Sequence, residues 1–178
     1  MSRIGKEPVK LPEGVTATIS GQLVTVKGKL GELSYTMHEG ITAKVEDGKI
    51  LVACADDYTL GNFHGLARAL INNMVIGVSA GYTKQLSIEG TGFKAVLKGQ
   101  VLALSLGFAS PKVIAIPAGL TVTVENDGLQ VTIKGVSKEV VGEAAARIRS
   151  YYPAEPYKGK GIKYVGERIR RKQGKKVA

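Results

Sequence analysis

Short runs of alternating apolar and polar residues recur along the chain, and a period of two is the pattern of β-strands with one buried face. We predict strands at residues 16–19, 23–27, 42–46, 50–54, 94–97, 101–106, 121–125 and 129–133. Hairpin turns are indicated at Ser20-Gly21-Gln22, Asp47-Gly48-Lys49, Lys98-Gly99-Gln100 and Asn126-Asp127-Gly128. The pattern therefore predicts antiparallel sheets, each with one face that another element has to cover.

Two longer segments repeat apolar residues at steps of three and four, which is the period of an amphipathic helix. In the first, at residues 59–79, the predicted apolar stripe consists of Leu60, Phe63, Ala67, Leu70, Met74 and Val78. In the second, between Ser137 and Pro153, the predicted buried residues are Val140 or Val141, Ala144 and Ile148. The expected caps are Asp57 or Thr59 before the first helix, Gly81 after it and Ser137 before the second.

The order of strands, turns and helix is the same in both halves of the chain, which indicates an internal repeat. With Gly14 aligned on Gly92, Ala17 meets Ala95, and after a one-residue insertion the matches continue to Ala67-Arg68 on Ala146-Arg147. We therefore predict an α+β fold of two tandem similar domains, 1–82 and 83–178, followed by an extended basic C-terminal tail. Each domain is expected to be a small antiparallel β-sheet packed on one α-helix.

The positive charge of the chain is concentrated near its C-terminal end. The 178 residues carry a formal net charge of +10, and nine of these ten charges come from residues 147–178, which hold eleven Lys or Arg and two acids. The residues before Arg147 are close to neutral. A near-neutral body with a cationic arm is typical of a protein that binds a polyanion.

Glycine, proline and tyrosine interrupt the charges of the tail, at Pro153, Pro156, Tyr157, Gly159, Gly161 and Tyr164. These residues exclude a regular helix or a central strand, and residues 166–176 are expected to be extended or disordered. Lysine and arginine bind phosphates by charge, glycine lets the backbone approach a phosphate, and tyrosine stacks on bases. A solubilising tail would need charge alone, so the residues favour a nucleic acid, and irregular RNA over smooth duplex DNA.

The sequence offers little for catalysis, metal binding or a cofactor. The single cysteine, Cys54, falls in an apolar run, and His38 and His64 lack a second ligand at metal-binding spacing. The Gly-Lys pairs lack the rest of a phosphate-binding loop, and the glycines of residues 89–94 precede a strand, which favours a bulged turn over a dinucleotide fingerprint. We therefore predict a non-enzymatic protein without a cofactor or a metal.

The N-terminal residues have no apolar core of signal-peptide type, and no apolar run approaches the roughly 18 residues of a membrane span. We therefore expect a cytoplasmic protein without membrane contact. Two alternatives to a specific RNA-binding protein stay open from the residues alone. One is a general nucleic-acid-binding or compacting protein, and the other is a protein-docking adaptor with a basic tail.

Several stretches resemble the large-subunit ribosomal protein L6 family in its bacterial form, over the whole length of the chain. The most specific is the tail motif Glu155-Pro156-Tyr157-Lys158-Gly159-Lys160-Gly161-Ile162. The others are Ser2-Arg3-Ile4-Gly5-Lys6 with Pro8 and Leu11-Pro12-Glu13-Gly14-Val15, Asn72-Asn73-Met74 with Gly77-Val78, and Ile88-Glu89-Gly90-Thr91-Gly92-Phe93-Lys94-Ala95. Two departures are Ala154, where Pro or Ser is expected, and Phe108-Ala109-Ser110-Pro111, which replaces a His-containing loop.

The resemblance implies a structural, non-enzymatic constituent of the large ribosomal subunit with two tandem α+β domains. It implies binding of 23S rRNA near the base of the flexible factor-binding stalk and close to the sarcin–ricin loop, mainly through the second domain and the tail. The implied partners are 23S rRNA, neighbouring ribosomal proteins at the stalk base and, transiently, translational GTPases, with no homo-oligomer.

The resemblance also implies which residues contact RNA. In the tail they are Tyr157, Lys158, Gly159, Lys160, Gly161, Lys163, Tyr164, Arg168, Arg170, Arg171, Lys172, Lys175 and Lys176. Outside the tail they are Gly92, Phe93 and Lys94 at the start of the second domain, and Arg3 and Lys6 near the N-terminus.

Overall fold

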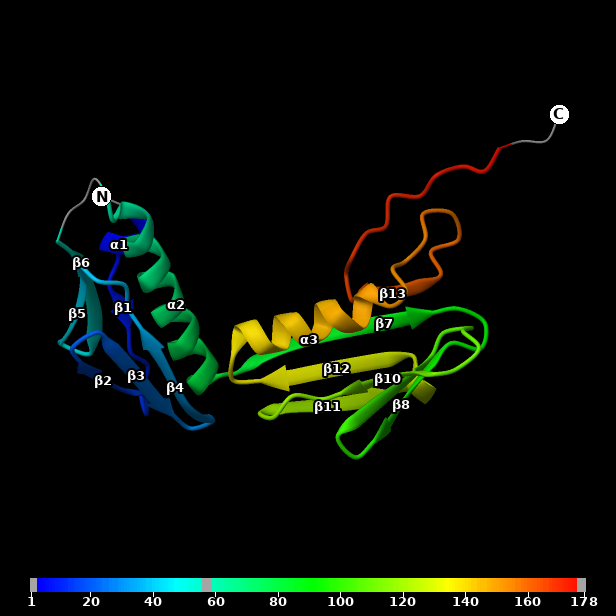
Figure 1. Ribbon diagram of the computed structural model, residues 1–178, viewed down its shortest axis with the longest axis horizontal. Coiled ribbons are helices and arrows are strands. Elements are labelled where there is room, and N and C mark those ends of the chain that lie inside the picture. Colours follow the sequence, from blue (N-terminus) through cyan, green and yellow to red (C-terminus); the bar gives the residue numbers. More distant parts are fainter. Residues whose placement is uncertain (1–2, 56–58, 176–178) are drawn as a thin grey trace. The chain divides into compact units, whose positions relative to one another are not determined.

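The structure is a computed structural model that describes residues 3–55 and 59–175. The chain separates into two compact units, Met1–Tyr82 with Val136–Lys138, and Thr83–Gly135 with Glu139–Ala178. Each unit combines antiparallel strands with one long helix, α2 in the first and α3 in the second (Figure 1). The predicted α+β class with two sheet-and-helix units is confirmed.

The described residues of the first unit form two three-stranded antiparallel sheets, β2-β3-β4 and β1-β6-β5. Their strands are β1 (Val9–Lys10), β2 (Thr16–Ser20), β3 (Leu23–Gly28), β4 (Gly31–Thr36), β5 (Ile41–Glu46) and β6 (Lys49–Cys54). The helices are the short α1 (Arg3–Lys6) and the long α2 (Gly61–Ser79).

Helix α2 buries an apolar face in the core of the first unit. Ala67, Met74 and Val78 of the predicted stripe are buried, but Ile71 and Val75 are buried in addition, and Leu60, Phe63 and Leu70 are only partly buried. The stripe is therefore rotated slightly from the predicted one. His64 is also buried, and its Nε2 lies 2.9 Å from the carbonyl oxygen of Val52.

The predicted caps of α2 are right at one end and wrong at the other. Gly81, with a φ of +75°, ends the helix, and its N–H donates to the carbonyl oxygen of Ile76 at 3.2 Å. The N-cap position belongs to Leu60 instead of Thr59, and no side chain caps it, while Asp57 lies outside the described residues. A side-chain cap is worth about 1 kcal/mol, less than the roughly 1.5–3 kcal/mol from burying one isoleucine, so packing fixes this helix without it.

The second unit contains β7 (Tyr82–Glu89), β8 (Lys94–Lys98), β9 (Val101–Ser105), β10 (Lys112–Ala115), β11 (Leu120–Glu125), a 3₁₀ turn η1 (Asn126–Gly128), β12 (Gln130–Gly135), α3 (Lys138–Ser150) and β13 (Gly161–Tyr164). One sheet has the order β10-β9-β8, and the other has the order β11-β12-β7-β13. Helix α3 buries Val141, Ala145 and Ile148. The prediction of Ala144 as a core residue is wrong by one position, because Ala145 takes that place and Ala144 is half-buried.

All four predicted hairpin turns are confirmed by the strand registers. The two-residue loop between β5 and β6, for example, consists of Asp47 and Gly48, both with positive φ, as the tightest hairpin turns require. The sequence prediction missed α1, β1, β4, β7, β10 and β13. As a consequence, each unit has two small sheets instead of the single sheet that was predicted.

Candidate nucleic-acid interface

Strand β13 lies inside the basic tail and belongs to the sheet of the second unit. It pairs antiparallel with β7, with Ile162 opposite Ile88 and Tyr164 opposite Leu86. Ile162, Ile88 and Leu86 are almost completely buried. The middle of the tail is therefore part of the hydrophobic core, and β13 is an edge strand, which agrees with the prediction that no central strand passes through the tail.

The tail loop, residues 153–160, connects α3 to β13, and the terminal segment, residues 168–175, returns to it. The N–H of Lys172 donates to the carbonyl oxygen of Pro156 at 2.9 Å. In Figure 1 the tail loop is orange and the terminal segment is red. The described terminal segment has no regular secondary structure, as expected for an extended segment. The hydrogen bond holds the cations of the two parts close to one another.

The two glycines of the tail motif have backbone and packing reasons of their own. Gly161 has a φ of +134°, and a Cβ at this position would lie 2.7 Å from the carbonyl oxygen of Pro153 and from Cα of Ala154. Gly159 has a φ of +78°, and a Cβ there would lie 3.5 Å from the guanidinium of Arg171. Gly161 is therefore required for the tail loop to close on β13, which is a role apart from the expected approach to a phosphate.

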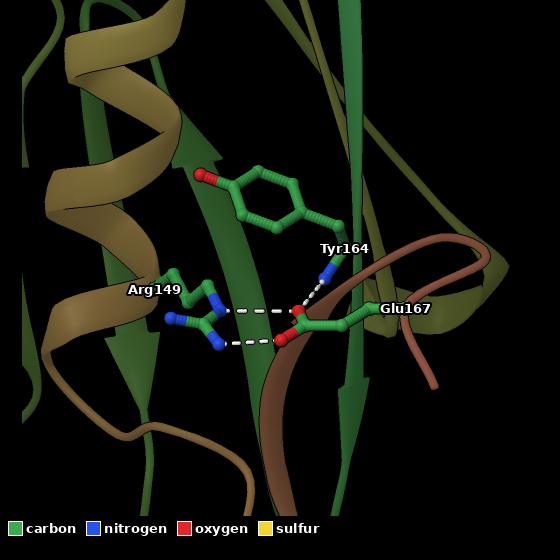
Figure 2. Close-up of polar contacts among 3 residues, drawn as sticks. All are labelled: Arg149, Tyr164 and Glu167. Atoms are coloured by element: carbon green, nitrogen blue, oxygen red, sulfur yellow. Dashed lines mark hydrogen bonds and ion pairs between the residues drawn. The ribbon is translucent and has the colours of Figure 1, made fainter. Parts of the chain in front are cut away.

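Arg149 of α3 and Glu167, which follows β13, form a two-point ion pair (Figure 2). Nε of Arg149 donates to Oε2 of Glu167 at 3.1 Å, and Nη2 donates to Oε1. The backbone N–H of Tyr164 donates to the same Oε2 at 3.0 Å. The hydrogen bonds from Arg149, followed by that from Tyr164, hold the pKa of the Glu167 carboxyl below its ordinary value, and the carboxylate raises the pKa of Arg149. The pair fixes the turn from which the terminal segment leaves β13.

Two of the predicted RNA contacts, Lys163 and Tyr164, are engaged inside the second unit. Lys163 forms an ion pair with Glu89, and its side chain is only 23% exposed. The cationic groups of Lys84 and Arg149 each lie 5.6 Å from the centroid of the Tyr164 ring. Tyr157, by contrast, is 54% exposed and is the tail tyrosine better placed to stack on a base.

The described cations of the tail loop and the terminal segment are exposed and are not neutralised by ion pairs within the described residues. They are Lys158, Lys160, Arg168, Arg170, Arg171, Lys172 and Lys175. A hollow in the surface is lined by Arg168, Ile169, Arg170 and Arg171. Cations that are exposed and unpaired are available to replace the counterions of a phosphate backbone.

The predicted contacts outside the tail lie in two different units. Gly92 has a φ of +75° in the turn between β7 and β8, and Lys94 is exposed at the start of β8. The turn confirms the interpretation of residues 89–94 as a strand connection. Arg3 and Lys6 are exposed on α1 of the first unit. Lys176 lies outside the described residues.

Sequence reasoning missed the residues that hold the tail in place. Arg149 comes from a helix, Glu167 from the turn after β13 and Glu89 from the end of β7, and no local spacing in the sequence connects them. The only available signal was that Glu167 is one of the two acids among eleven cations after residue 146, and an isolated acid in a basic segment indicates an internal ion pair.

Among the described residues, no cluster of three or more His, Cys, Asp or Glu is arranged to hold a metal ion. No helix in that part of the chain has the length and apolarity needed to span a membrane. A cavity of about 30 Å³ between α3 and β11 has a mainly apolar lining that includes Leu102, Ile114 and Val122, and it has room for little more than a water molecule.

The family model described as ribosomal protein L6 matches residues 11–81 and 89–165, so each half of the chain matches once. The large ribosomal subunit protein uL6 of Magnetococcus marinus is 52% identical over 177 residues, covering 99% of both chains. The proteins of the same name from Trichlorobacter lovleyi and Phenylobacterium zucineum are 51% and 49% identical, over 98% and 99% of both chains.

The double match agrees with the internal repeat that the sequence predicted, and the relatives are similar over almost the full length of this chain. The family is structural and non-enzymatic, in agreement with the sequence prediction. The chain belongs to the ribosomal protein L6 family, whose bacterial members are proteins of the large ribosomal subunit.

Proposed function

We propose that this protein is a structural constituent of the large ribosomal subunit that binds 23S rRNA through its second domain and its basic tail. The binding site is near the base of the flexible factor-binding stalk and close to the sarcin–ricin loop, as the family resemblance implies. Bound there, the protein supports the surface on which translational GTPases dock. Family membership supports the ribosomal role, and the charge distribution supports the choice of the binding half.

The observation that carries this proposal is a set of exposed cations on a folded, fixed support. Ile162 anchors the tail in the core, and the Arg149–Glu167 pair fixes the turn after β13. The cations of the tail loop and the terminal segment project from this support without an ion-pair partner among the described residues. Because the support is fixed before binding, less conformational entropy is lost on binding than for a disordered arm.

We propose that domains 1–82 and 83–178 bind different partners. The second domain carries the tail and binds rRNA, and the first domain contacts neighbouring ribosomal proteins at the stalk base and, transiently, GTPases. The charge supports this division, because the chain before Arg147 is nearly neutral. A near-neutral surface gains little from counterion release and is better suited to protein contacts.

Two lysines of the tail loop provide a test that leaves the core intact. Lys158→Ala with Lys160→Ala removes two exposed cations, and Lys44→Ala with Lys49→Ala removes two exposed cations from the first unit. In a filter-binding titration with 23S rRNA, the tail pair is expected to weaken binding and to lower the salt slope by about 0.7–0.9 per lost contact. Equal affinities of the two double variants would contradict RNA binding by the tail loop.

Competition separates specific rRNA binding from general compaction of nucleic acids. The wild-type chain bound to labelled 23S rRNA is challenged with unlabelled 23S rRNA or with duplex DNA of mixed sequence. The proposal predicts that rRNA displaces the label at much lower concentration, because a folded RNA presents a shaped array of phosphates and unpaired bases. Equal competition by both nucleic acids would favour a compacting protein instead.

A further inference from the structure

Three aromatic rings from distant parts of the sequence meet in the second unit and form an aromatic cluster, Phe93, Phe108 and Tyr152. The centroids of Phe93 and Tyr152 are 5.0 Å apart, and those of Phe108 and Tyr152 are 6.1 Å apart, both edge to face. Phe93 lies in the turn after β7, Phe108 in the loop between β9 and β10, and Tyr152 two residues after the end of α3. Both loops are at the end of the unit to which the β7 arrow points (Figure 1).

Two of the three rings serve packing. Phe93 is half-buried, and its ring lies so close to Gly90 that a Cβ there would be 2.5 Å away. Tyr152 is half-buried, and its carbonyl oxygen accepts the N–H of Ile162 at 2.8 Å. The predicted RNA contact at Phe93 therefore has a structural role, because its ring is held between the turn and Tyr152.

Phe108 is different, because it makes an edge-to-face contact with Tyr152 and is nevertheless 45% exposed. Exposing an aromatic ring to water is unfavourable, and an aromatic platform with a rigid support is what a stacking partner needs. The contact with Tyr152 also links Phe108 to the tail loop, because Tyr152 directly precedes that loop in the chain.

The surroundings of Phe108 carry positive charge. The ammonium of Lys112 lies 5.2 Å from the centroid of the Phe108 ring. An exposed ring beside an ammonium group matches a nucleotide, which offers a flat base and a phosphate, better than it matches an apolar segment of another protein.

We propose that Phe108 and Lys112 form a nucleobase-binding site, in which the Phe108 ring stacks on an unpaired base of rRNA and Lys112 binds an adjacent phosphate. This inference rests on the proposed rRNA binding by the second domain and adds a site outside the tail. The base has to be unpaired, because the bases of an intact helix are covered by their neighbours.

Tryptophan fluorescence tests the stacking directly, because the chain has no tryptophan of its own. In the Phe108→Trp variant, addition of 23S rRNA is expected to quench the emission, with a midpoint that matches the binding curve. The control is Leu66→Trp, at a residue on α2 of the first unit that is 48% exposed, where emission is expected to stay unchanged. Unquenched emission of the Phe108→Trp variant while it binds rRNA would overturn the proposal.

Leucine and tyrosine at position 108 separate stacking from simple apolar contact. Phe108→Leu is expected to lose about 5- to 150-fold in affinity for 23S rRNA, and Phe108→Tyr to retain it, because only the planar ring stacks. The salt slope is expected to stay unchanged in Phe108→Leu and to fall by about 0.7–0.9 in Lys112→Ala. Thermal unfolding of each variant checks that the fold is intact.

The outcomes distinguish this inference from the proposed function on which it rests. If the wild-type chain binds 23S rRNA and Phe108→Leu binds equally well, the nucleobase site is wrong and the tail remains the binding element. If Phe108→Leu and Phe108→Tyr lose affinity equally, the ring does not stack. If the wild-type chain does not bind 23S rRNA, the proposed function and the nucleobase site are both contradicted.

Discussion

At the scale of single residues, the tail is held by contacts between residues far apart in the sequence. Glu167 is the clearest case, because it accepts hydrogen bonds from the side chain of Arg149 and from the backbone of Tyr164. No local pattern in the sequence predicts such a pairing. What the sequence did indicate was the type of residue at the turns, where Gly81 and Gly92 both have the positive φ that only glycine adopts easily.

Glu167→Gln is expected to destabilise the second unit by about 1 kcal/mol at neutral pH, because the ion pair is partly exposed and screened by solvent. The folded-state pKa of Glu167 is lowered, so its stabilising contribution is complete above the unfolded carboxyl pKa of about 4.3 and is lost as the pH falls through the folded value. Chemical unfolding of both proteins from neutral to acidic pH measures this, and the two stabilities should converge in acid. A difference that stays constant with pH would contradict the assigned role.

Gly161→Ala is expected to destabilise the second unit by roughly 2 kcal/mol or more, because the new Cβ would collide with the backbone at Pro153 and Ala154. The matched control is Gly174→Ala, where no heavy atom lies within 4 Å of the added Cβ. Thermal unfolding followed by circular dichroism compares the two variants. Equal melting temperatures for both would show that the tail loop has room for a side chain at position 161.

At the scale of elements, the alternation of apolar and polar residues predicted the strands in which it continues over the whole strand. It did not predict strands of which only a part is buried. The first half of strand β7 includes the exposed Thr83, Lys84 and Gln85, and only its second half, with Leu86 and Ile88, enters the core. Strand β13 has four residues in a segment rich in glycine and charge, and its place at the sheet edge comes from pairing with β7. Such strands exist because of tertiary pairing, which the local sequence does not encode.

The place where the tail is cut is expected to decide whether the second unit stays folded. A chain that ends at Glu167 keeps β13 and the Arg149 pair, so its melting temperature should match that of the full chain. A chain that ends at Pro156 loses the buried Ile162 and exposes the edge of β7, which is expected to cost about 2–5 kcal/mol. Hydrogen exchange at the amides of β7 reports the difference, and equal protection in both truncated chains would contradict a structural role for β13.

At the scale of the whole molecule, the repeat and the charge asymmetry were both visible in the sequence. The two halves share their order of turns and their helix, and the family model matches each half once. The tail follows the second copy, so a duplicated fold is combined with a single basic arm. The sequence could predict where the charge lies, but it could not predict that the middle of the arm is a strand of the core.

The central claim is that a folded second unit presents the terminal segment to the phosphates of 23S rRNA. The most direct measurement is the salt dependence of 23S rRNA affinity for the full chain and for the chain that ends at Glu167. The shorter chain lacks six cations, so its slope of log affinity against log salt concentration is expected to be smaller by as much as about 4 to 5 units. Identical slopes for the two chains, with both second units folded, would contradict the claim.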